Sequence, residues 1–190
     1  DQALGRIDIL VNNAGIPSHA HPESISLTEW NRILSVNVTG YLLCAQQAIR
    51  RFLSQGTGGS IINIGSIAGV SALGRGNFAY SVSKGAVAQF TRELAIEFAG
   101  KGIRVNAILP AQVRTPALQA LIDDPQFDSE SLIARFLAGL PINRLLEPDD
   151  FVGPTVFLAS SAAAAVTGVL LPVDGGNLAL NASGSHTWPS

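Results

Sequence analysis

The sequence predicts an α/β protein with a doubly wound parallel sheet, of which about four strands with their flanking helices are present. Short, continuous apolar runs recur along the chain, and longer segments with helical spacing separate them. Strands whose apolar residues do not alternate with polar ones are buried on both faces, which is typical of parallel sheets. The regular alternation of strand and helix is the pattern of doubly wound folds.

Four buried strands are expected. Each is a run rich in Ile, Val and Leu that ends at Gly, Asn, Pro or Asp. The four runs are Ile7–Asn13, Ser60–Gly65, Ile103–Leu109 and Val169–Val173. Because neighbouring parallel strands need long crossover connections, helices are expected between them.

Three helices fit these connections. The first covers Thr28–Ser54, with Thr28 as its N-cap. The second covers about Phe78–Ala99 and is apolar on nearly all sides, so it must bury more than one face. We expect one of those faces to form a subunit interface, although a large core would also explain the pattern. The third covers Asp149–Ala159.

The segment from Thr115 to Leu140 interrupts this rhythm. It follows the carboxyl end of a strand, where ligands bind in open α/β sheets. We therefore expect a substrate lid at 115–140, within a single domain that covers residues 1–190. Its acidic residues are interpreted as a solvated face and not as a metal site; they are Asp123, Asp124, Asp128 and Glu130.

Composition limits the classes of function. The 190 residues are 47% hydrophobic and 14% charged, with a mean hydropathy of +0.31 and a net charge of −2. This apolar character favours a homo-oligomer, a dimer or tetramer, or an incomplete piece of a larger fold. No basic run marks a nucleic-acid site, and no apolar run reaches the length of a membrane span. Neither nucleic acid nor a membrane is therefore an expected partner. With no secretory leader before the first strand, the expected localisation is cytoplasmic.

Cys44 is the only cysteine, which excludes an intrachain disulfide. It lies within the first predicted helix. We expect it to be a small residue of the core.

The most informative motif is Tyr80-Ser81-Val82-Ser83-Lys84, with Ser66 upstream of it. A tyrosine and a lysine four residues apart lie on one face of a helix. A nearby ammonium group favours the ionised phenol and lowers the tyrosine pKa, which is ordinarily about 10. Tyr80 could then exchange a proton near neutral pH, while the hydroxyl of Ser66 could hydrogen-bond a substrate carbonyl.

Further motifs follow in one order along the chain. They are Asn12-Asn13-Ala14-Gly15, Asn37 within Val36–Gly40, Asn63–Ser66, Tyr80 with Lys84, Arg104–Ala107 with Pro110, and Val173–Gly176. This constellation closely resembles the short-chain dehydrogenase/reductase family over nearly the whole chain. The resemblance implies a Rossmann-like fold and hydride transfer between a nicotinamide cofactor, NAD or NADP, and a carbonyl or secondary alcohol of a small molecule. A 3-oxoacyl compound, a polyol, a sugar or a sugar acid all remain open as the substrate.

The resemblance also implies roles for individual residues. Tyr80 would be the catalytic acid/base, and Ser66 would orient and polarise the carbonyl. Lys84 would hold the nicotinamide ribose and lower the pKa of Tyr80, and Asn37 would anchor a water in a proton relay behind Lys84. Further cofactor contacts would come from two strand ends: Asn13, Ala14, Gly15, Pro110, Val113 and Thr115. No metal is implied.

One family element is not found. Members of the family open with a strand and a glycine-rich turn, T-G-x-x-x-G-x-G, whose following helix receives the pyrophosphate. Here Gly74–Ala79 fits G-x-G-x-x-G/A, but it does not follow a strand directly and is interpreted as the turn that lets Tyr80 face Ser66. We therefore expect an N-terminally truncated chain that holds only the C-terminal part of the fold. Ile7–Asn13 would be an unpaired edge strand, and the chain alone would bind dinucleotides poorly.

Two other interpretations remain. The chain could be a truncated or non-catalytic family member that acts only as a binding or assembly module. Alternatively, the tyrosine and lysine could serve epimerisation or dehydration of nucleotide sugars, although the short tail after Val173–Gly176 leaves little room for a large substrate domain. His19 and His21 are interpreted as solvated loop residues that could instead edge the pocket.

Overall fold

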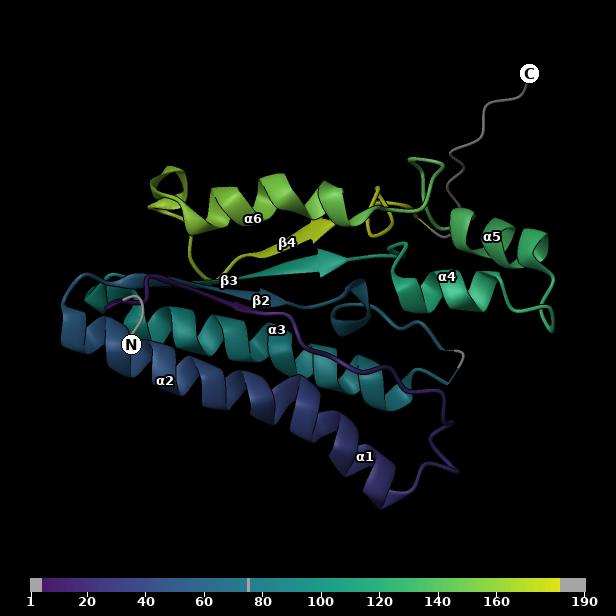
Figure 1. Ribbon diagram of the computed structural model, residues 1–190, viewed down its shortest axis with the longest axis horizontal. Coiled ribbons are helices and arrows are strands. Elements are labelled where there is room, and N and C mark those ends of the chain that lie inside the picture. Colours follow the sequence, from purple (N-terminus) through teal and green to yellow (C-terminus); the bar gives the residue numbers. More distant parts are fainter. Residues whose placement is uncertain (1–4, 75, 182–190) are drawn as a thin grey trace.

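A four-stranded parallel sheet with helices on both faces forms the protein (Figure 1). The computed structural model describes residues 5–74 and 76–181. The strands lie side by side in chain order and are β1 (Ile9–Asn12), β2 (Gly59–Ile64), β3 (Ile103–Pro110) and β4 (Leu170–Val173). All three neighbouring pairs are parallel. The predicted fold class and the four predicted strands are confirmed.

The two faces of the sheet are covered by different helices. Ile61 packs on one face against α2 (Gly40–Gln55) and α3 (Phe78–Phe98), in a core that includes Phe52. Its neighbour Ile62 packs on the other face against α6 (Val152–Ala159). Because successive residues of a strand point to opposite faces, a continuous apolar run fills both cores. Figure 1 shows α2 and α3 on one side of the sheet and α6 on the other.

The first predicted helix is interrupted, which corrects the expected range Thr28–Ser54. It consists of α1 (Leu27–Leu34), a π-helical turn at Ser35–Thr39 and α2. The N-cap is Ser26 and not Thr28, since its hydroxyl accepts a hydrogen bond from the backbone N–H of Glu29 at 3.1 Å. The π turn contains the buried Asn37, and single π turns of this kind are frequent at functional sites.

The position of Cys44 is also corrected. Its side chain is exposed, whereas the buried face of α2 is formed by Tyr41, Ala45, Ala48, Ile49 and Phe52. Cys44 comes directly before a buried residue, and one position on a helix is a rotation of about 100°. An apolar composition therefore did not identify which side of the helix faces the core.

The other two helices are close to their predicted ranges. α3 covers 21 residues and continues into a short 3₁₀ turn, and α6 is preceded by a 3₁₀ turn at Pro148–Phe151. No helix in the described ranges is both long and apolar enough to cross a membrane.

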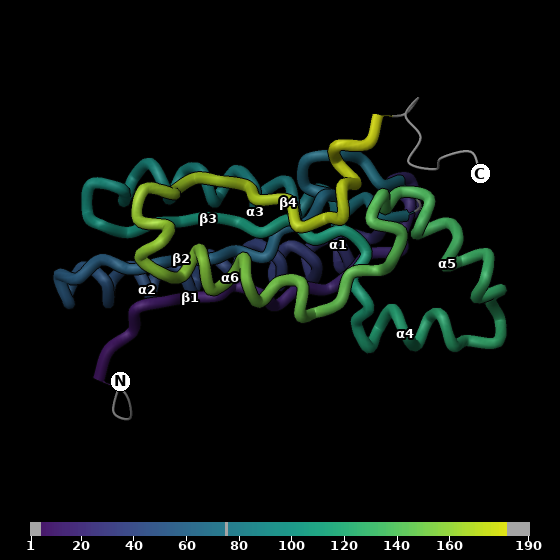
Figure 2. Tube along the Cα trace, turned by 90° about the horizontal axis from the view of Figure 1, so that it is seen from above, coloured from purple at the N-terminus to yellow at the C-terminus, as the bar shows by residue number. Residues whose placement is uncertain are grey.

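The segment expected to be a lid contains two short helices, α4 (Pro116–Ile122) and α5 (Ser129–Leu137). Figure 2 shows the pair at one end of the molecule. They share a small core in which Ile122, Leu140 and Leu145 are buried. Within the residues described, no group of three or more His, Cys, Asp or Glu side chains could hold a metal ion. The segment is thus a packed unit, and its role as a lid stays a prediction.

Candidate active site

Buried asparagines join the ends of two strands to a helix. The Asn12 amide at the end of β1 donates to the side chain of Asn63 on β2 at 2.9 Å, and the Asn63 amide donates to Thr91 of α3 at 3.0 Å. All three side chains are buried. Because buried polar groups are costly unless paired, this chain of hydrogen bonds fixes α3 relative to the carboxyl ends of both strands.

Lys84 of α3 is buried beside the end of β2. The residue is only 3% exposed, and its ammonium nitrogen Nζ donates to the backbone carbonyl of Ile64 at 2.7 Å. The Tyr41 hydroxyl donates to the same carbonyl at 3.0 Å, and the Lys84 ammonium lies 5.5 Å from the centre of the Tyr41 ring. Burial lowers the pKa of Lys84 to about 8.

Asn37 connects the loop after β1 to α3. Its side chain oxygen accepts from the N–H of Ile16 at 2.8 Å, and its amide nitrogen donates to the Ile16 carbonyl at 3.0 Å and to the Ser83 hydroxyl at 2.9 Å. A Cβ added to Gly15 would lie 3.5 Å from both the Asn37 oxygen and the Lys84 nitrogen. Asn37 and Lys84 are therefore neighbours, as predicted. The water relay remains a prediction.

Tyr80 and Ser66 face each other at the start of α3. Ser66 lies shortly after β2 and caps the 3₁₀ turn Ile67–Gly69. Its side chain forms a hydrogen bond with that of Tyr80. Burial raises the pKa of Tyr80, while the hydrogen bond with Ser66 acts in the opposite direction and is the smaller effect. The expectation that Lys84 lowers this pKa is therefore wrong for this structure: the ammonium lies 5.8 Å from the centre of the Tyr80 ring, and burial dominates.

The predicted cofactor contacts lie on two loops at this edge of the sheet. Asn13, Ala14 and Gly15 are exposed directly after β1. On the far side of β2, Pro110 ends β3, Val113 pairs with Leu146, and the Thr115 hydroxyl caps α4 by accepting from the Leu118 N–H at 3.2 Å. Since β1, β2 and β3 are parallel neighbours, both loops lie at the same end of the sheet as Ser66.

Gly76 and Asn77 lead directly into α3, and the role of this turn in orienting Tyr80 stays a prediction. Gly76 has a positive φ of 74°, and a Cβ there would lie 3.0 Å from the carbonyl oxygen of His19. Ala20 pairs with Asn77 across the same contact. His19 and His21 are exposed, as expected of loop histidines, and His21 borders an apolar pocket of about 280 Å³ beside this turn.

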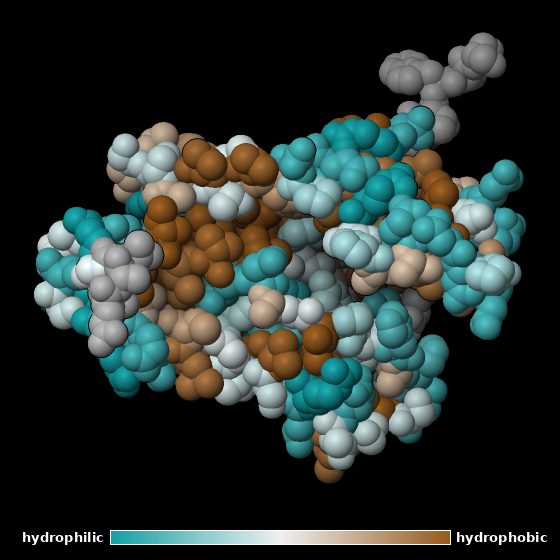
Figure 3. All heavy atoms as spheres, in the orientation of Figure 1, coloured by the Kyte–Doolittle hydropathy of each residue, from teal (hydrophilic) through white to brown (hydrophobic). Residues whose placement is uncertain are grey.

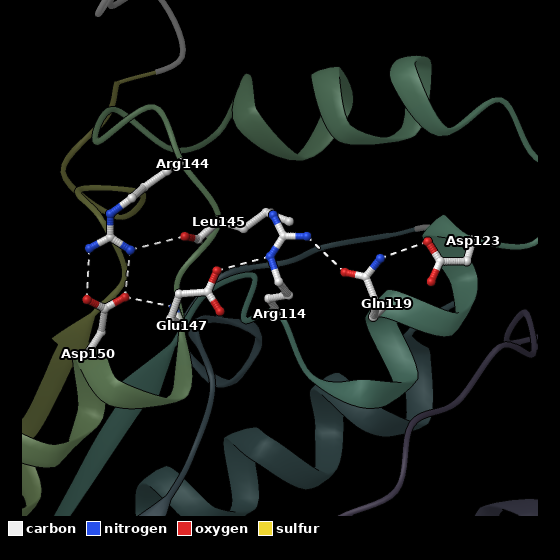
Figure 4. A network of polar contacts seen from close by, with 7 residues as sticks. All are labelled: Arg114, Gln119, Asp123, Arg144, Leu145, Glu147 and Asp150. Carbon is white, nitrogen blue, oxygen red and sulfur yellow. Dashed lines mark hydrogen bonds and ion pairs between the residues drawn. The ribbon is translucent and has the colours of Figure 1, made fainter.

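A network of polar side chains connects the residues before α4 with those after α5; we call these two stretches the base of the α4–α5 segment (Figure 4). The Arg114 guanidinium donates to Glu147 at 3.0 Å and to Gln119 of α4 at 2.9 Å. Arg144 forms a two-bond ion pair with Asp150, at 2.7 and 2.8 Å, which lowers the pKa of that carboxyl to about 2. Residues that enter and leave the segment are thereby held together.

Sequence reasoning missed two residues of this site. Tyr41 shares an acceptor with Lys84, and the Ser83 hydroxyl bonds both the Asn37 amide and the Tyr80 carbonyl. The signal for Tyr41 was its spacing of four residues from Asn37, which puts the two on one helix face. No pattern distinguished Ser83 from other helix serines.

Comparison with known proteins bears on this arrangement. Residues 1–177 match the family described as "Enoyl-(Acyl carrier protein) reductase". The chain belongs to the short-chain dehydrogenase/reductase family.

The names of similar proteins within the family refer to different substrates. The chain is 39% identical to "Inactive 2-(S)-hydroxypropyl-CoM dehydrogenase 2" of Xanthobacter autotrophicus, over 95% of this chain and 77% of that protein. It is 38% identical to "Rhamnolipids biosynthesis 3-oxoacyl-[acyl-carrier-protein] reductase" of Pseudomonas aeruginosa, over 92% of this chain and 69% of that protein. A solved structure of a putative 2-deoxy-D-gluconate 3-dehydrogenase from Agrobacterium tumefaciens, with bound NADP, superposes with a TM-score of 0.85. It is 36% identical and matches 91% of this chain and 68% of its own.

Proposed function

We propose that the protein is an NAD(P)-dependent oxidoreductase that transfers a hydride between the nicotinamide ring and a carbonyl or secondary alcohol of a small molecule. The observation that carries the proposal is the cluster in which the half-buried Tyr80 and the buried Ser66 lie beside the buried Lys84 and Asn37. Membership of the short-chain dehydrogenase/reductase family and an NADP-bound structural neighbour support it.

The residues fit the nicotinamide end of such a cofactor. An ammonium group has three donors, and the Ile64 carbonyl takes one of those on Lys84, which leaves donors for ribose hydroxyls. Gly15 has no side chain and lies beside that nitrogen, so the approach to it from the β1 loop is open. We infer that Asn13, Ala14 and Gly15 line one side of the bound cofactor, and that Pro110, Val113 and Thr115 line the carboxamide side.

Proton transfer is assigned to Tyr80. When bound, the cofactor supplies the hydride chemistry. In the direction of reduction the Tyr80 hydroxyl donates its proton to the carbonyl oxygen as the new C–H bond forms, and the Ser66 hydroxyl donates a hydrogen bond to the same oxygen. Burial raises the pKa of Tyr80, so the phenol carries its proton at neutral pH, as a proton donor must. Lys84 would hold the ribose, and Asn37 would anchor a water in a proton relay behind Lys84.

Replacement of Tyr80 by Phe tests this assignment. The variant keeps the ring and removes the only group that donates the proton, so we expect kcat to fall by at least about 100-fold. The measurement is steady-state turnover of the complete protein with NAD and NADP on a panel of ketones and secondary alcohols. A Tyr80→Phe variant that retains wild-type turnover would show the mechanism to be wrong. A wild-type protein that binds cofactor without any turnover would favour the assembly module instead.

We further propose that these 190 residues alone bind dinucleotide weakly. In the ranges 5–74 and 76–181, no glycine-rich turn leads directly from a strand end into a helix N-terminus, where a pyrophosphate would be held. Calorimetric titration with NADH and NADPH measures this, and micromolar affinity for either would contradict it.

A further inference from the structure

Tyr41 is a buried tyrosine that the proposed mechanism does not use. The residue is only 2% exposed and belongs to the buried face of α2. Its hydroxyl donates to the backbone carbonyl of Ile64 at 3.0 Å, and the Lys84 ammonium donates to the same carbonyl at 2.7 Å. Packing alone would be served by phenylalanine, which has the same ring without the hydroxyl.

The shared acceptor lies at the end of β2, where the backbone is fixed. Ile64 is the last residue of β2 and pairs with Ile108 of β3. The next backbone N–H, that of Gly65, donates to the Ile108 carbonyl at 2.8 Å. A Cβ on Gly65 would lie 2.6 Å from the Leu109 side chain, so this part of the chain has little room to move. The two donors must therefore adjust to the carbonyl.

Two donors on one carbonyl weaken each other. A carbonyl oxygen has two lone pairs and can accept both hydrogen bonds, but each donor brings positive charge to the same atom and reduces its attraction for the other. Burial raises the pKa of Tyr41, so its hydroxyl keeps its proton and stays a donor while Lys84 titrates. The Tyr41 hydroxyl therefore weakens the hydrogen bond that stabilises the charged form of Lys84.

The ring of Tyr41 has a different effect, because it attracts the ammonium group. The Lys84 nitrogen lies 5.5 Å from the centre of this ring and 5.8 Å from that of Tyr80, within the range of cation–π contacts. The other polar side chain near this nitrogen is the neutral amide of Asn37, since both border the same Cβ position of Gly15. Within the described residues, Lys84 has no carboxylate partner. Burial raises the pKa of Tyr80 as well, so Lys84 is the group of this cluster that titrates first.

We propose that Tyr41 is a positioning residue for Lys84. Its ring holds the ammonium group beside the end of β2, and its hydroxyl, by sharing the Ile64 carbonyl, keeps that group weakly bound to the protein and available to an outside acceptor. The inference deepens the function proposed above, on which it rests for the identity of that acceptor, a ribose hydroxyl of the nicotinamide cofactor. The weaker the bond to the protein, the less free energy is lost when the ammonium turns towards a ligand.

An NMR titration of the ligand-free protein tests this inference. The chain has two lysines, Lys84 and Lys101, so isotope labelling of lysine at Cε gives one signal for each, and Lys84→Met assigns them. In Tyr41→Phe the ring remains and the Ile64 carbonyl accepts from Lys84 alone, which favours the charged form. The pKa of Lys84 should then rise by roughly 0.5 to 1 pH unit. Lys101 is exposed and follows the far end of α3, so its signal should follow one curve in both proteins.

Ser60→Ala is the matched control. The Ser60 hydroxyl is also buried and also donates to a backbone carbonyl at 3.0 Å, that of Leu158, but it lies at the opposite end of β2. This variant should leave the pKa of Lys84 as in wild type. An unchanged or lower pKa of Lys84 in Tyr41→Phe, with or without a loss of stability, would overturn the inference. An equal rise in Ser60→Ala would also overturn it.

Steady-state kinetics of the complete protein separate this inference from the proposed function. If charged Lys84 binds the ribose, KM for the cofactor should rise above about pH 8 in wild type. In Tyr41→Phe the rise should begin at a pH higher by the same roughly 0.5 to 1 unit. Identical pH profiles of KM in the two proteins would overturn the role of Tyr41 in cofactor binding. Absence of wild-type turnover on any ketone or alcohol with either cofactor would overturn the proposed function, and the NMR titration would still decide whether Tyr41 acts on Lys84.

Discussion

Lys84 is a charged side chain in a place that disfavours charge. Its nitrogen has one backbone acceptor, the Ile64 carbonyl, and the rings of Tyr41 and Tyr80 at 5.5 and 5.8 Å from their centres. Within the described residues it forms no ion pair with a carboxylate. Contact with aromatic faces offsets part of the cost of burial, yet the pKa still falls to about 8. At neutral pH most copies of the Lys84 side chain carry a charge, but the pKa lies only slightly above that pH.

This pKa predicts how stability depends on pH. Folded Lys84 loses its proton above about pH 8, whereas the unfolded chain keeps it to its ordinary value of 10.5. Between these values the unfolded state binds more protons, so the free energy of unfolding rises with pH. The Lys84→Met variant has no titrating group at this position and therefore serves as the reference. Wild type should therefore gain roughly 2 kcal/mol over this variant between about pH 7.5 and pH 9.5, as measured by urea unfolding.

The neighbouring tyrosines limit the useful pH range. Burial raises the pKa of both Tyr41 and Tyr80, so above about pH 10 the unfolded chain ionises first and stability falls. The comparison is therefore made below that pH. A difference between wild type and Lys84→Met that stays constant from about pH 7.5 to 9.5 would show that Lys84 is not destabilised by burial.

Much of the candidate site could be predicted at the level of single residues, because its motifs combine residue type with spacing. Tyr80, Lys84, Ser66 and Asn37 do lie together. The direction of the Tyr80 pKa shift could not be predicted, since it depends on how deeply the phenol is buried, and burial is a property of the packed protein. The same holds for the side-chain oxygen Oε1 of Gln112, which is buried without a hydrogen-bond partner among the described residues, because a sequence does not state which polar atoms find partners.

At the scale of elements, the strands were predictable and the interruption of the first helix was not. Four continuous apolar runs define the sheet because parallel strands are buried on both faces. The break at Ser35–Thr39 follows from bonds between the Asn37 side chain and Ile16, a residue of a distant loop. Helical periodicity reports local spacing only, and a contact across 21 residues is not contained in it.

The α4–α5 segment gives a prediction of its own, through Arg114. This residue binds Glu147 before α6 and Gln119 within α4, so it joins the segment to the body of the protein. Replacing it with Met should loosen α4 and leave the sheet unchanged. Hydrogen exchange of the α4 amides should speed up by roughly threefold to tenfold, the size of one or two partly exposed hydrogen bonds.

Arg144→Met is the matched control for this experiment. It removes an arginine ion pair of similar exposure at the same base, but Arg144 binds Asp150 and does not bind α4. Exchange in α4 should stay at the wild-type rate in this variant. Equal acceleration in both variants would mean that the base of the segment acts as a whole and that Arg114 has no particular role.

For the whole molecule, the dominant feature is an apolar surface beside an open sheet edge. β1 pairs only with β2 in the described structure, and its Ile9 and Val11 are 47% and 43% exposed. Across the sheet edge, Val152 and Val156 of α6 are also exposed. Figure 3 shows hydrophobic residues gathered over this part of the surface. A net charge of −2 gives little electrostatic repulsion between copies.

These properties predict that the 190-residue chain associates with itself through the β1 edge. An apolar edge strand with free backbone groups is a template for pairing, and charged residues on such strands prevent it. Ile9→Lys with Val11→Lys should therefore shift the chain towards the monomer in light scattering after gel filtration, at concentrations of about 10 to 100 μM. Leu27→Lys is the control, because Leu27 is 78% exposed on α1, away from this edge. If the control dissociates the assembly as well as the β1 variant does, association depends on overall hydrophobicity and not on the open edge.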